Sequence, residues 1–182
     1  MQYEKTVQLK DGTRCTLRGA QAADGQALLE LFILTHGETD FLASYPDEVR
    51  LDAAAEADFL AKKAASANEI EILAVVDGEI AGTAGISAVG SGFKRRRRAV
   101  FGVSVARAYW GRGIGRALTE ACIACARKAG YAQLELEAVA DNRAATALYE
   151  KVGFREYGRN PRGFFSRSSG WQTLVLMRLE LD

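Results

Sequence analysis

A glycine-rich turn in the middle of the chain has the residue types and spacing to bind a phosphate. It follows an apolar, β-branched run and leads into a helical pattern, which places free backbone N–H groups and the positive end of a helix dipole together. The glycines let the backbone approach an anion closely, and two arginines add positive charge. The alternative is an ordinary strand–turn–helix corner. The residues assigned to this region are Val103, Ser104, Val105, Gly111, Arg112, Gly113, Ile114, Gly115 and Arg116.

Two better-known phosphate motifs do not fit this turn. The dinucleotide fingerprint needs glycine or alanine three places after its second glycine, where this chain has Arg116 or Leu118, depending on the starting glycine. The phosphate loop of NTPases needs Gly-Lys-Ser/Thr, which is missing from the chain. A nucleotide-cofactor enzyme is therefore disfavoured.

A second group of residues with chemical potential runs from Asn142 to Phe154. Its pattern is Asn-x-x-Ala-x-x-Leu-Tyr-x-x-x-Gly-Phe. The phenol of Tyr149 can protonate a departing thiolate, and the Asn142 amide offers both a hydrogen-bond donor and an acceptor. Each residue also has a purely structural interpretation, Tyr149 as a helix–sheet contact and Asn142 as a helix N-cap.

Together the two segments resemble the signatures of the GNAT N-acetyltransferase family. Trp110-Gly111-Arg112-Gly113-Ile114-Gly115 resembles the acyl-CoA pyrophosphate loop, Gln/Arg-x-x-Gly-x-Gly/Ala. It departs at Trp110, a modest change because the loop works mainly through backbone donors. The resemblance extends from about Thr13 to Leu181, and Glu38 to Leu42 (Glu-Thr-Asp-Phe-Leu) is similar to a bacterial subgroup.

The resemblance implies one α/β domain over residues 1–182, with helices flanking a mixed sheet that is splayed between its fourth and fifth strands. Those strands correspond to Val103–Val105 and Leu134–Ala138 here. Unpaired strand amides are costly unless something bonds them, and the pantetheine arm of coenzyme A can do so. A backbone N–H of the first strand would stabilise the oxyanion. The further coenzyme-binding residues implied are Asn142, Ala145 and Tyr149, with Tyr149 as the catalytic acid and no metal.

The implied activity is transfer of an acetyl group from acetyl-CoA to a primary amine, on a small molecule or a protein N-terminus, by direct attack. The alternative is a non-catalytic acyl-CoA-binding module of the same fold. A homodimer is a family expectation only.

The general base and the acceptor stay open at this stage. The segment Ala99–Val105 carries no carboxylate where some family members place a glutamate. The remaining base candidates are a water chain and residues after the first helix, with the only histidine, His36, ranked below water. Aromatic side chains could wall an acceptor pocket or belong to the core. The base candidates are Glu38, Asp40, Tyr45 and Glu48, and the aromatics are Phe41, Tyr45, Phe164, Phe165 and Trp171.

Length, charge and composition bear on the class of protein and on its location. With 182 residues and a net charge of +1, the chain fits one domain with no general attraction to nucleic acid or acidic membranes. No apolar run is long enough for a membrane span, and the N-terminus lacks the form of a signal peptide. Three cysteines cannot form a complete disulfide framework, so a reducing cytoplasm is expected.

The elements that must position these residues follow from periodicity and turn residues. A basic run, Lys94–Arg98, is interpreted as a solvated turn and strand start, and the alternative is that it binds an acidic partner or the coenzyme's ribose phosphate. Ala99–Val105 is expected to be a strand buried on both faces, and Asp24 and Asp52 are expected to cap helices. We expect strands at 6–9, 13–18, 71–76, 80–89, 99–105, 134–138, 154–167 and 171–181, and helices at 22–35, 51–67, 113–129 and 144–152.

Overall fold

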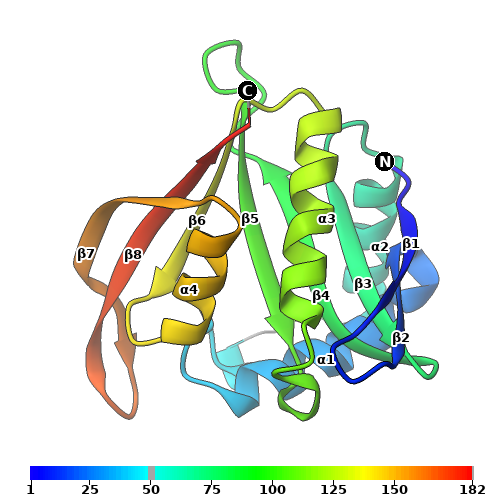
Figure 1. Cartoon of the computed structure of the whole chain (residues 1–182), viewed down its shortest axis with the longest axis horizontal. Helices are drawn as coiled ribbons and strands as arrows, with labels where there is room; N and C mark the ends of the chain where they lie inside the picture. The colour runs from blue at the N-terminus through cyan, green and yellow to red at the C-terminus, as the bar shows by residue number, and fades with distance from the viewer. Residues whose placement is uncertain (49–51, 182) are drawn as a thin grey trace.

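One mixed sheet of eight strands forms the centre of the protein in the computed structural model, which describes residues 1–48 and 52–181 (Figure 1). The strand order is β1-β2-β3-β4-β5-β6-β8-β7, and neighbours are antiparallel except β5 and β6. The strands are β1 (Glu4–Gln8), β2 (Arg14–Gly19), β3 (Ile70–Val76), β4 (Glu79–Ala88), β5 (Arg98–Val105), β6 (Gln133–Val139), β7 (Arg155–Ser166) and β8 (Gly170–Glu180). The helices are α1 (Gly25–Glu38), α2 (Ala53–Ala65), α3 (Ile114–Lys128) and α4 (Arg143–Lys151), with short 3-10 turns η1 (Ala22–Asp24), η2 (Pro46–Glu48) and η3 (Arg107–Tyr109).

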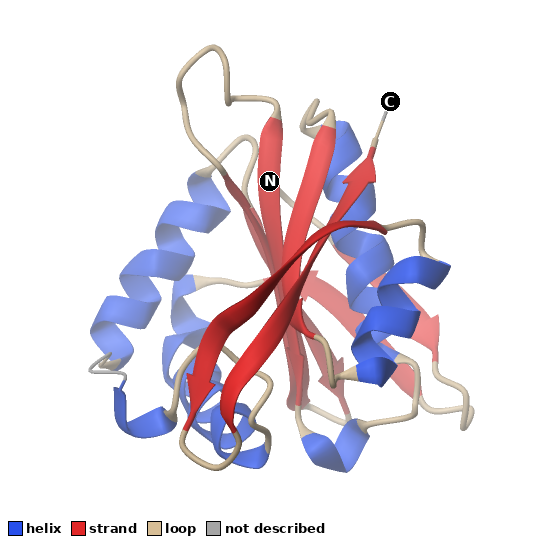
Figure 2. Cartoon of the chain, turned by 90° about the vertical axis from the view of Figure 1, so that its left-hand side faces the viewer, coloured by secondary structure: helices blue, strands red, loops and turns tan. Residues whose placement is uncertain are grey.

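The helices cover both faces of the sheet (Figure 2). Helices α1 and α2 lie on one face, where Leu28, Leu31 and Leu60 form a small buried cluster. Helices α3 and α4 lie on the other, and the larger core fills the space between α3 and the strands. Cys122 and Cys125 are free and buried in this core, which confirms that they are packing residues.

The predicted opening of the sheet is present at the predicted residues, but these belong to the fifth and sixth strands of this chain and not to the fourth and fifth. Strands β5 and β6 pair only at their first residues, from Arg98↔Gln133 to Val100↔Glu135, and then separate (Figure 1). Each strand keeps its outer neighbour, β4 for β5 and β8 for β6. The splay is therefore a local gap in an otherwise continuous sheet.

Several turns and caps confirm the sequence-based expectations, and others correct them. Asp77 and Gly78 both have positive φ, as a tight hairpin turn requires, and Asp52 accepts the Ala55 N–H at 2.7 Å. Asp24 does not cap α1, because its carboxylate binds the Arg18 guanidinium at 2.7 Å and the Gln21 N–H at 2.8 Å. The expected first residue of the second helix, Leu51, lies outside the described residues.

Strand β5 differs from its prediction, because only one of its faces is buried. Ala99 and Phe101 are buried in the larger core, whereas Val100 and Gly102 are exposed on the α1–α2 side. Neither of those helices extends over the start of this strand. The apolar run therefore forms a strand that has one face in the core and, at its start, the other face exposed.

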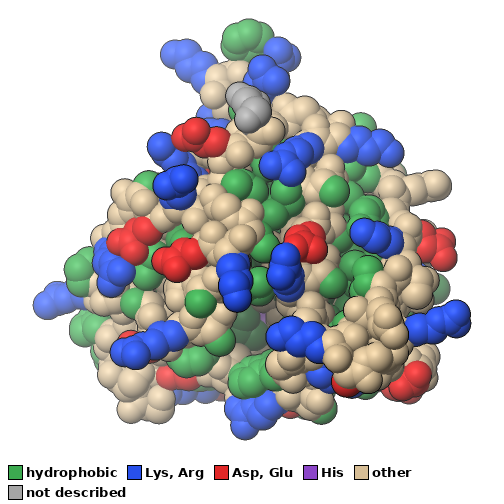
Figure 3. Space-filling view, in the orientation of Figure 1, with side chains coloured by type: hydrophobic (Ala, Val, Ile, Leu, Met, Phe, Trp, Pro, Cys, Tyr) green, Lys and Arg blue, Asp and Glu red, His purple; other side chains and the backbone are tan. Residues whose placement is uncertain are grey.

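The basic run lies on the loop between β4 and β5, far from the glycine turn. Figure 3 shows Lys and Arg side chains gathered on the loop that projects at the top of the view. Lys94 to Arg97 are exposed in turns, and Arg98 begins β5 with an ion pair to Glu135 at 2.5 Å. Because the glycine turn follows the opposite end of β5, the run cannot reach a coenzyme phosphate bound there. The structure thus confirms the predicted turn and strand start.

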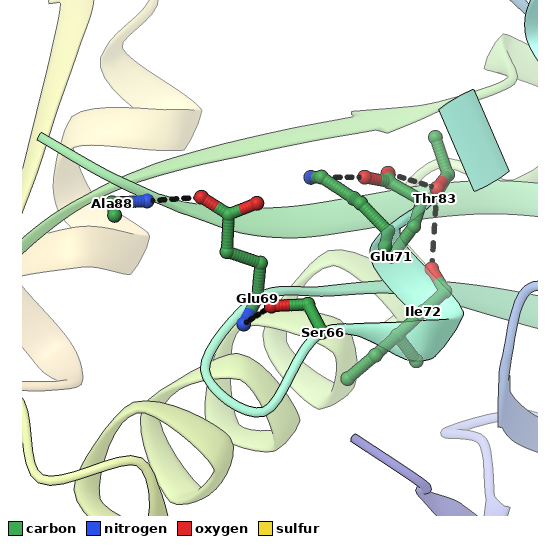
Figure 4. Close-up of polar contacts among 7 residues, drawn as sticks. Ser66, Glu69, Glu71, Ile72, Thr83 and Ala88 are labelled. Atoms are coloured by element: carbon green, nitrogen blue, oxygen red, sulfur yellow. Dashed lines mark hydrogen bonds and ion pairs between the residues drawn. The ribbon is translucent and has the colours of Figure 1, made fainter. Parts of the chain in front are cut away.

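A buried ion pair joins α2 to the sheet. Lys63 Nζ lies 2.9 Å from Glu71 Oε2, and Thr83 Oγ1 donates to Glu71 Oε1 at 2.6 Å (Figure 4). A Cβ on Gly85 would collide with the Glu71 carboxylate, so glycine is needed beside the pair. The side chains of Lys63 and Glu71 are only 7% and 12% exposed. A neutral partner at either position would leave a largely buried charge uncompensated.

Candidate active site

A cavity of about 830 Å³ joins the glycine turn, the splay and α4. Of the coenzyme-binding residues predicted from the sequence, all except Arg112 line it. Basic side chains surround the hollow between α3 and α4 on this face (Figure 3). Further residues that the sequence did not assign to the site also line it: Lys10, Thr35, Thr39, Leu42, Tyr109, Asp141, Arg143, Ala144, Ala147, Leu148 and Lys151.

The glycine turn presents a row of free amides to this cavity. None of the backbone N–H groups from Gly111 to Arg116 donates to an acceptor in the described part of the chain; the next amide, of Ala117, binds the Gly113 carbonyl at 3.1 Å. Gly111 and Gly113 have φ of 76° and 98°, a conformation that other residues adopt only with strain. Six consecutive free donors at the start of α3 form a site for an anion.

The splayed edge of β5 offers backbone groups deeper in the cavity. The Ala106 N–H points to β4, where it binds the Ala81 carbonyl at 3.0 Å. Because successive residues of a strand alternate, the N–H and C=O groups of Val103 and Val105 point the opposite way, into the splay. Trp110 Nε1 binds the Val105 carbonyl at 2.6 Å, so the residue that departs from the family pattern anchors the turn to the end of the strand. The Val103 groups and the Val105 N–H face the cavity.

Tyr149 lies on α4 at the wall of the same cavity. Its ring is 8% exposed and packs edge-on against Phe101 and Phe154, at 6.2 and 5.9 Å between centroids. Its hydroxyl has no hydrogen-bond partner among the described residues, which leaves it available to a ligand. Burial raises the pKa of Tyr149 to about 12, so the side chain is a neutral phenol at physiological pH. The residue has the position and protonation state of a proton donor.

Asn142 has the structural role expected for it. Its Oδ1 accepts the Ala145 N–H at 3.2 Å, which makes it the N-cap of α4. The Nδ2 group has no acceptor among the described residues and can donate into the cavity, which Asn142 and Ala145 both line. At the other end of α4, Gly153 has φ of 105° and closes the helix. These caps fix the helix that carries Tyr149.

The two arginines of the glycine turn are engaged elsewhere. Arg112 Nε binds Asp11 Oδ2 at 2.6 Å, and Arg112 Nη2 binds Thr13 Oγ1 at 2.9 Å. Arg116 lines the cavity but pairs with Glu120 at 2.7 Å on the surface of α3. The prediction that Arg112 adds free positive charge to the phosphate site is therefore not met by its side chain.

The segment after α1 is held against the β7–β8 turn by Asp40. Its carboxylate accepts hydrogen bonds from Tyr45 Oη at 2.7 Å, from Ser168 Oγ at 2.9 Å and from the Ser166 hydroxyl. These bonds lower the pKa of Asp40, with the Ser166 hydroxyl the largest cause. A smaller cavity of about 210 Å³ lies between the two segments, and Leu42 lines both cavities. Asp40 thus fixes the segment that carries Leu42 against the β7–β8 turn.

The four side chains predicted as base candidates are all hydrogen-bonded within the protein, and none lines the larger cavity. Glu38 accepts the Arg107 N–H at 2.7 Å, and Glu48 accepts the Tyr45 N–H at 2.9 Å. The Tyr45 hydroxyl donates to Asp40 and accepts the Arg167 N–H at 2.9 Å. Each of these groups would lose a structural contact if it took a proton from a substrate.

His36 and the predicted aromatic wall are also placed. The His36 ring stacks on Phe32 at 3.6 Å between centroids, and burial lowers its pKa. Among the aromatics, Phe41 lines the larger cavity, while Tyr45, Phe164 and Phe165 line the smaller one. Trp171 is 56% exposed and packs on Phe165, outside both cavities.

Two further features concern residues 1–48 and 52–181, the part of the chain that the structure describes. No group of three His, Cys, Asp or Glu side chains there is arranged to hold a metal ion. No helix within the same residues has the length and apolar character to cross a membrane.

A splayed sheet that opens onto an anion-binding turn is the architecture of an acyltransferase that uses acyl-coenzyme A as the donor. Residues 29–154 match the model of the acetyltransferase (GNAT) family. The protein belongs to this family, as its two sequence signatures predicted.

Individual relatives agree with this assignment. A ribosomal protein bS18-alanine N-acetyltransferase from Escherichia coli is 38% identical over 83 residues, 46% of this chain and 55% of the relative. The chain thus spans about half the length of the curated relatives it matches. An acetyltransferase of the GNAT family from Streptococcus pneumoniae has a TM-score of 0.87 and 30% identity, over 92% of this chain and 99% of that one. A phosphinothricin acetyltransferase from Sinorhizobium meliloti, solved with acetyl-CoA, shares the fold, with a TM-score of 0.79 and 22% identity over 92% and 88% of the two chains.

Proposed function

We propose that the protein transfers the acetyl group of acetyl-CoA to a primary amine by direct attack. The observation that carries this proposal is that one cavity contains both the free amides of the glycine turn and the Tyr149 hydroxyl, joined by the open edge of β5. A diphosphate fits the free amides, and a thioester fits beside the Tyr149 hydroxyl. The strand edge between them has the donors and acceptors that an amide-bearing chain needs.

Each step has a residue of this chain beside it. The nitrogen lone pair of the amine attacks the thioester carbonyl carbon, and the Val103 or Val105 N–H stabilises the oxyanion that forms. The C–S bond then breaks, and Tyr149 donates its proton to the departing thiolate sulfur. The proton that the attacking nitrogen releases as the amide forms passes through solvent and restores the Tyr149 phenol. Burial keeps Tyr149 protonated for this step. The same dry surroundings raise the proton affinity of the sulfur, which helps the transfer.

We assign deprotonation of the amine to water rather than to a side chain. Glu38, Asp40, Tyr45 and Glu48 are committed to structural hydrogen bonds, and none lines the larger cavity. His36 Nδ1 donates to the Phe32 carbonyl at 2.8 Å, and His36 is also outside the cavity lining. An amine with a pKa near its usual value of about 10 loses its proton before attack, and solvent reaches the site through the open cavity.

The acceptor enters, in this proposal, past Phe41 and Leu42. Candidate amines include small polyamines, aminoglycosides and the amino termini of proteins, the last supported by the relative that acts on alanine of a ribosomal protein. The reducing cytoplasm is the proposed site of the reaction, in keeping with three free, buried cysteines.

Calorimetric titration with acetyl-CoA, followed by a free-thiol assay over a panel of amines, tests the proposal. The panel contains spermidine, an aminoglycoside and peptides that begin with alanine. Binding together with thiol release for one amine establishes the activity and the substrate class. Binding without release across a broad panel favours the non-catalytic alternative, and failure to bind acetyl-CoA overturns the proposal.

A further inference from the structure

We propose that Lys10, on the turn between β1 and β2, binds a phosphate of the coenzyme, and that Arg112 positions Lys10 instead of touching phosphate itself. This inference rests on the proposed use of acetyl-CoA. It assigns a role to the N-terminal hairpin, which packs beside the glycine turn although about a hundred residues separate them in the sequence (Figure 1).

The hairpin is joined to the glycine turn by three polar contacts. The Lys10 N–H donates to the Arg112 carbonyl at 3.1 Å. The Arg112 guanidinium in turn holds Asp11 and Thr13, on either side of the tip of the hairpin. The backbone of Lys10 is therefore fixed relative to the row of free amides. The Lys10 side chain, although exposed, lines the cavity.

The Lys10 side chain lies across Gly113. A Cβ on that glycine would lie 3.7 Å from Lys10 Cγ and 3.9 Å from Lys10 Cε, which is ordinary contact distance. Lys10 lines the cavity together with Gly111, Gly113 and Arg116. The aliphatic part of the Lys10 side chain thus passes the αL glycine that precedes α3, and Lys10 lines the same cavity as the free amides.

The balance of charge favours Lys10 over the arginines as the phosphate ligand. Arg112 is paired with Asp11, and Arg116 with Glu120, so each guanidinium already has a carboxylate partner. Hydrogen bonds from Thr13 and Arg112 lower the pKa of Asp11, so it stays ionised. Within the described residues Lys10 has no such partner. An unpaired ammonium beside free amides is the cation with most to gain from a phosphate.

The ligand group is a phosphate ester of coenzyme A, either the diphosphate bound by the amides or the 3′-phosphate on the ribose. The two sources are separated by comparing coenzyme A with 3′-dephospho-coenzyme A. Calorimetric titration of both compounds into the wild type and Lys10→Met gives four affinities. Lys5→Met is the control, because it removes the same charge from an exposed position on β1 of the same hairpin.

The Lys10 variant should bind coenzyme A about 10-fold more weakly than the wild type, the effect of losing one charge-assisted contact. If the wild type prefers coenzyme A and the variant does not, Lys10 meets the 3′-phosphate. If the variant loses affinity for both compounds equally, Lys10 meets the diphosphate. Equal affinities of Lys10→Met, Lys5→Met and the wild type overturn the inference. A wild type that binds neither compound overturns the proposed function instead.

The positioning role of Arg112 is tested through its partner. Asp11→Asn keeps the shape of the tip but weakens the contact that orients Arg112. We expect a smaller loss of affinity than for Lys10→Met and no added loss in the double variant Asp11→Asn/Lys10→Met, because both changes act through the same ammonium group. Additive losses would show that Asp11 and Arg112 act independently of Lys10 and would overturn the positioning role.

Discussion

Val100 and Glu135 are the last pair through which β5 and β6 are joined, and further along β5 its residues Val103 to Val105 line the larger cavity. Glu135 also anchors Arg98 at the start of β5, so the closed end of the splay is held by an ion pair as well as by the ladder. Towards the open end, Trp110 fastens the glycine turn to Val105. The sheet is thus fixed on both sides of a gap whose edge can bind a ligand.

The role of Tyr149 predicts a specific loss of rate. Tyr149→Phe removes the hydroxyl and keeps the ring that packs on Phe101 and Phe154. The acetylation rate should fall by about one to three orders of magnitude, while affinity for acetyl-CoA stays nearly unchanged. Steady-state rates and calorimetry measure the two effects. Tyr157→Phe, at a half-exposed position outside the cavity, is the control, and unchanged turnover of Tyr149→Phe would remove the assignment.

The raised pKa of Tyr149 predicts a loss of stability at alkaline pH. The folded-state pKa of about 12 lies above the unfolded value of about 10, so the folded state favours the neutral phenol. This contribution is complete below pH 10 and disappears as the pH rises toward 12, about 2–3 kcal/mol in all. Denaturant unfolding at pH 8 to 12 should show the wild type losing this amount relative to Tyr149→Phe. Parallel curves for the two proteins would contradict the pKa shift.

If the glycine turn binds an anion, a negative charge placed in the turn should weaken acetyl-CoA binding more than backbone strain alone would. Gly113→Asp would place a carboxylate where the phosphates bind, and calorimetry should show affinity for acetyl-CoA reduced by about 100-fold or more. Gly130→Asp is a matched control, because Gly130 also has positive φ but follows the opposite end of α3. Equal affinity of the two variants would mean that the turn is only a structural corner.

The hydrogen bonds of Asp40, which hold the segment after α1 against the β7–β8 turn, predict an effect on acceptor binding and not on coenzyme binding. Asp40→Asn replaces an oxygen that accepts the hydroxyls of Ser166 and Ser168 with an amide donor, which loosens the wall that carries Leu42. The KM for the acceptor found in the amine panel should rise about 10-fold, with affinity for acetyl-CoA unchanged. Asp47→Asn, which alters an exposed ion pair with Arg167 nearby, should leave both unchanged. A loss of kcat at constant KM would instead point to Asp40 as the base.

The buried pair between Lys63 and Glu71 predicts non-additive stability changes. Glu71→Gln should lower the free energy of unfolding by about 3 kcal/mol, because it leaves the Lys63 ammonium buried without a counter-charge. Lys63→Met should cost a similar amount. The double variant Lys63→Met/Glu71→Gln should be less destabilised than the sum of the two, as urea unfolding would show. Simple additivity would mean that the two charges do not stabilise each other.

Local sequence was sufficient for most of the elements and for the two ligand-binding segments. Periodicity and turn residues predicted the hairpins, the helix behind the glycine turn and the C-terminal glycine of α4, because these depend on neighbours within a few residues. The motifs assigned Gly111, Gly113, Asn142 and Tyr149 to one site, and all four line the larger cavity. The error at β5 has the same origin, since an apolar run shows that a strand is buried but not whether both faces are covered.

The sequence by itself determined the family, the positions of the glycine turn and Tyr149, and therefore the chemistry that the site supports. The tertiary structure decided which charges reach that site. Arg112 is beside the turn in sequence but is held by Asp11, and Lys10 comes to the cavity from a hairpin about a hundred residues away. Likewise, carboxylates that looked free in the sequence, such as Glu38 and Asp40, accept hydrogen bonds from distant segments. The interaction between two charges depends on their distance in the folded protein, so a local pattern of residues does not show which distant partner will neutralise a given charge.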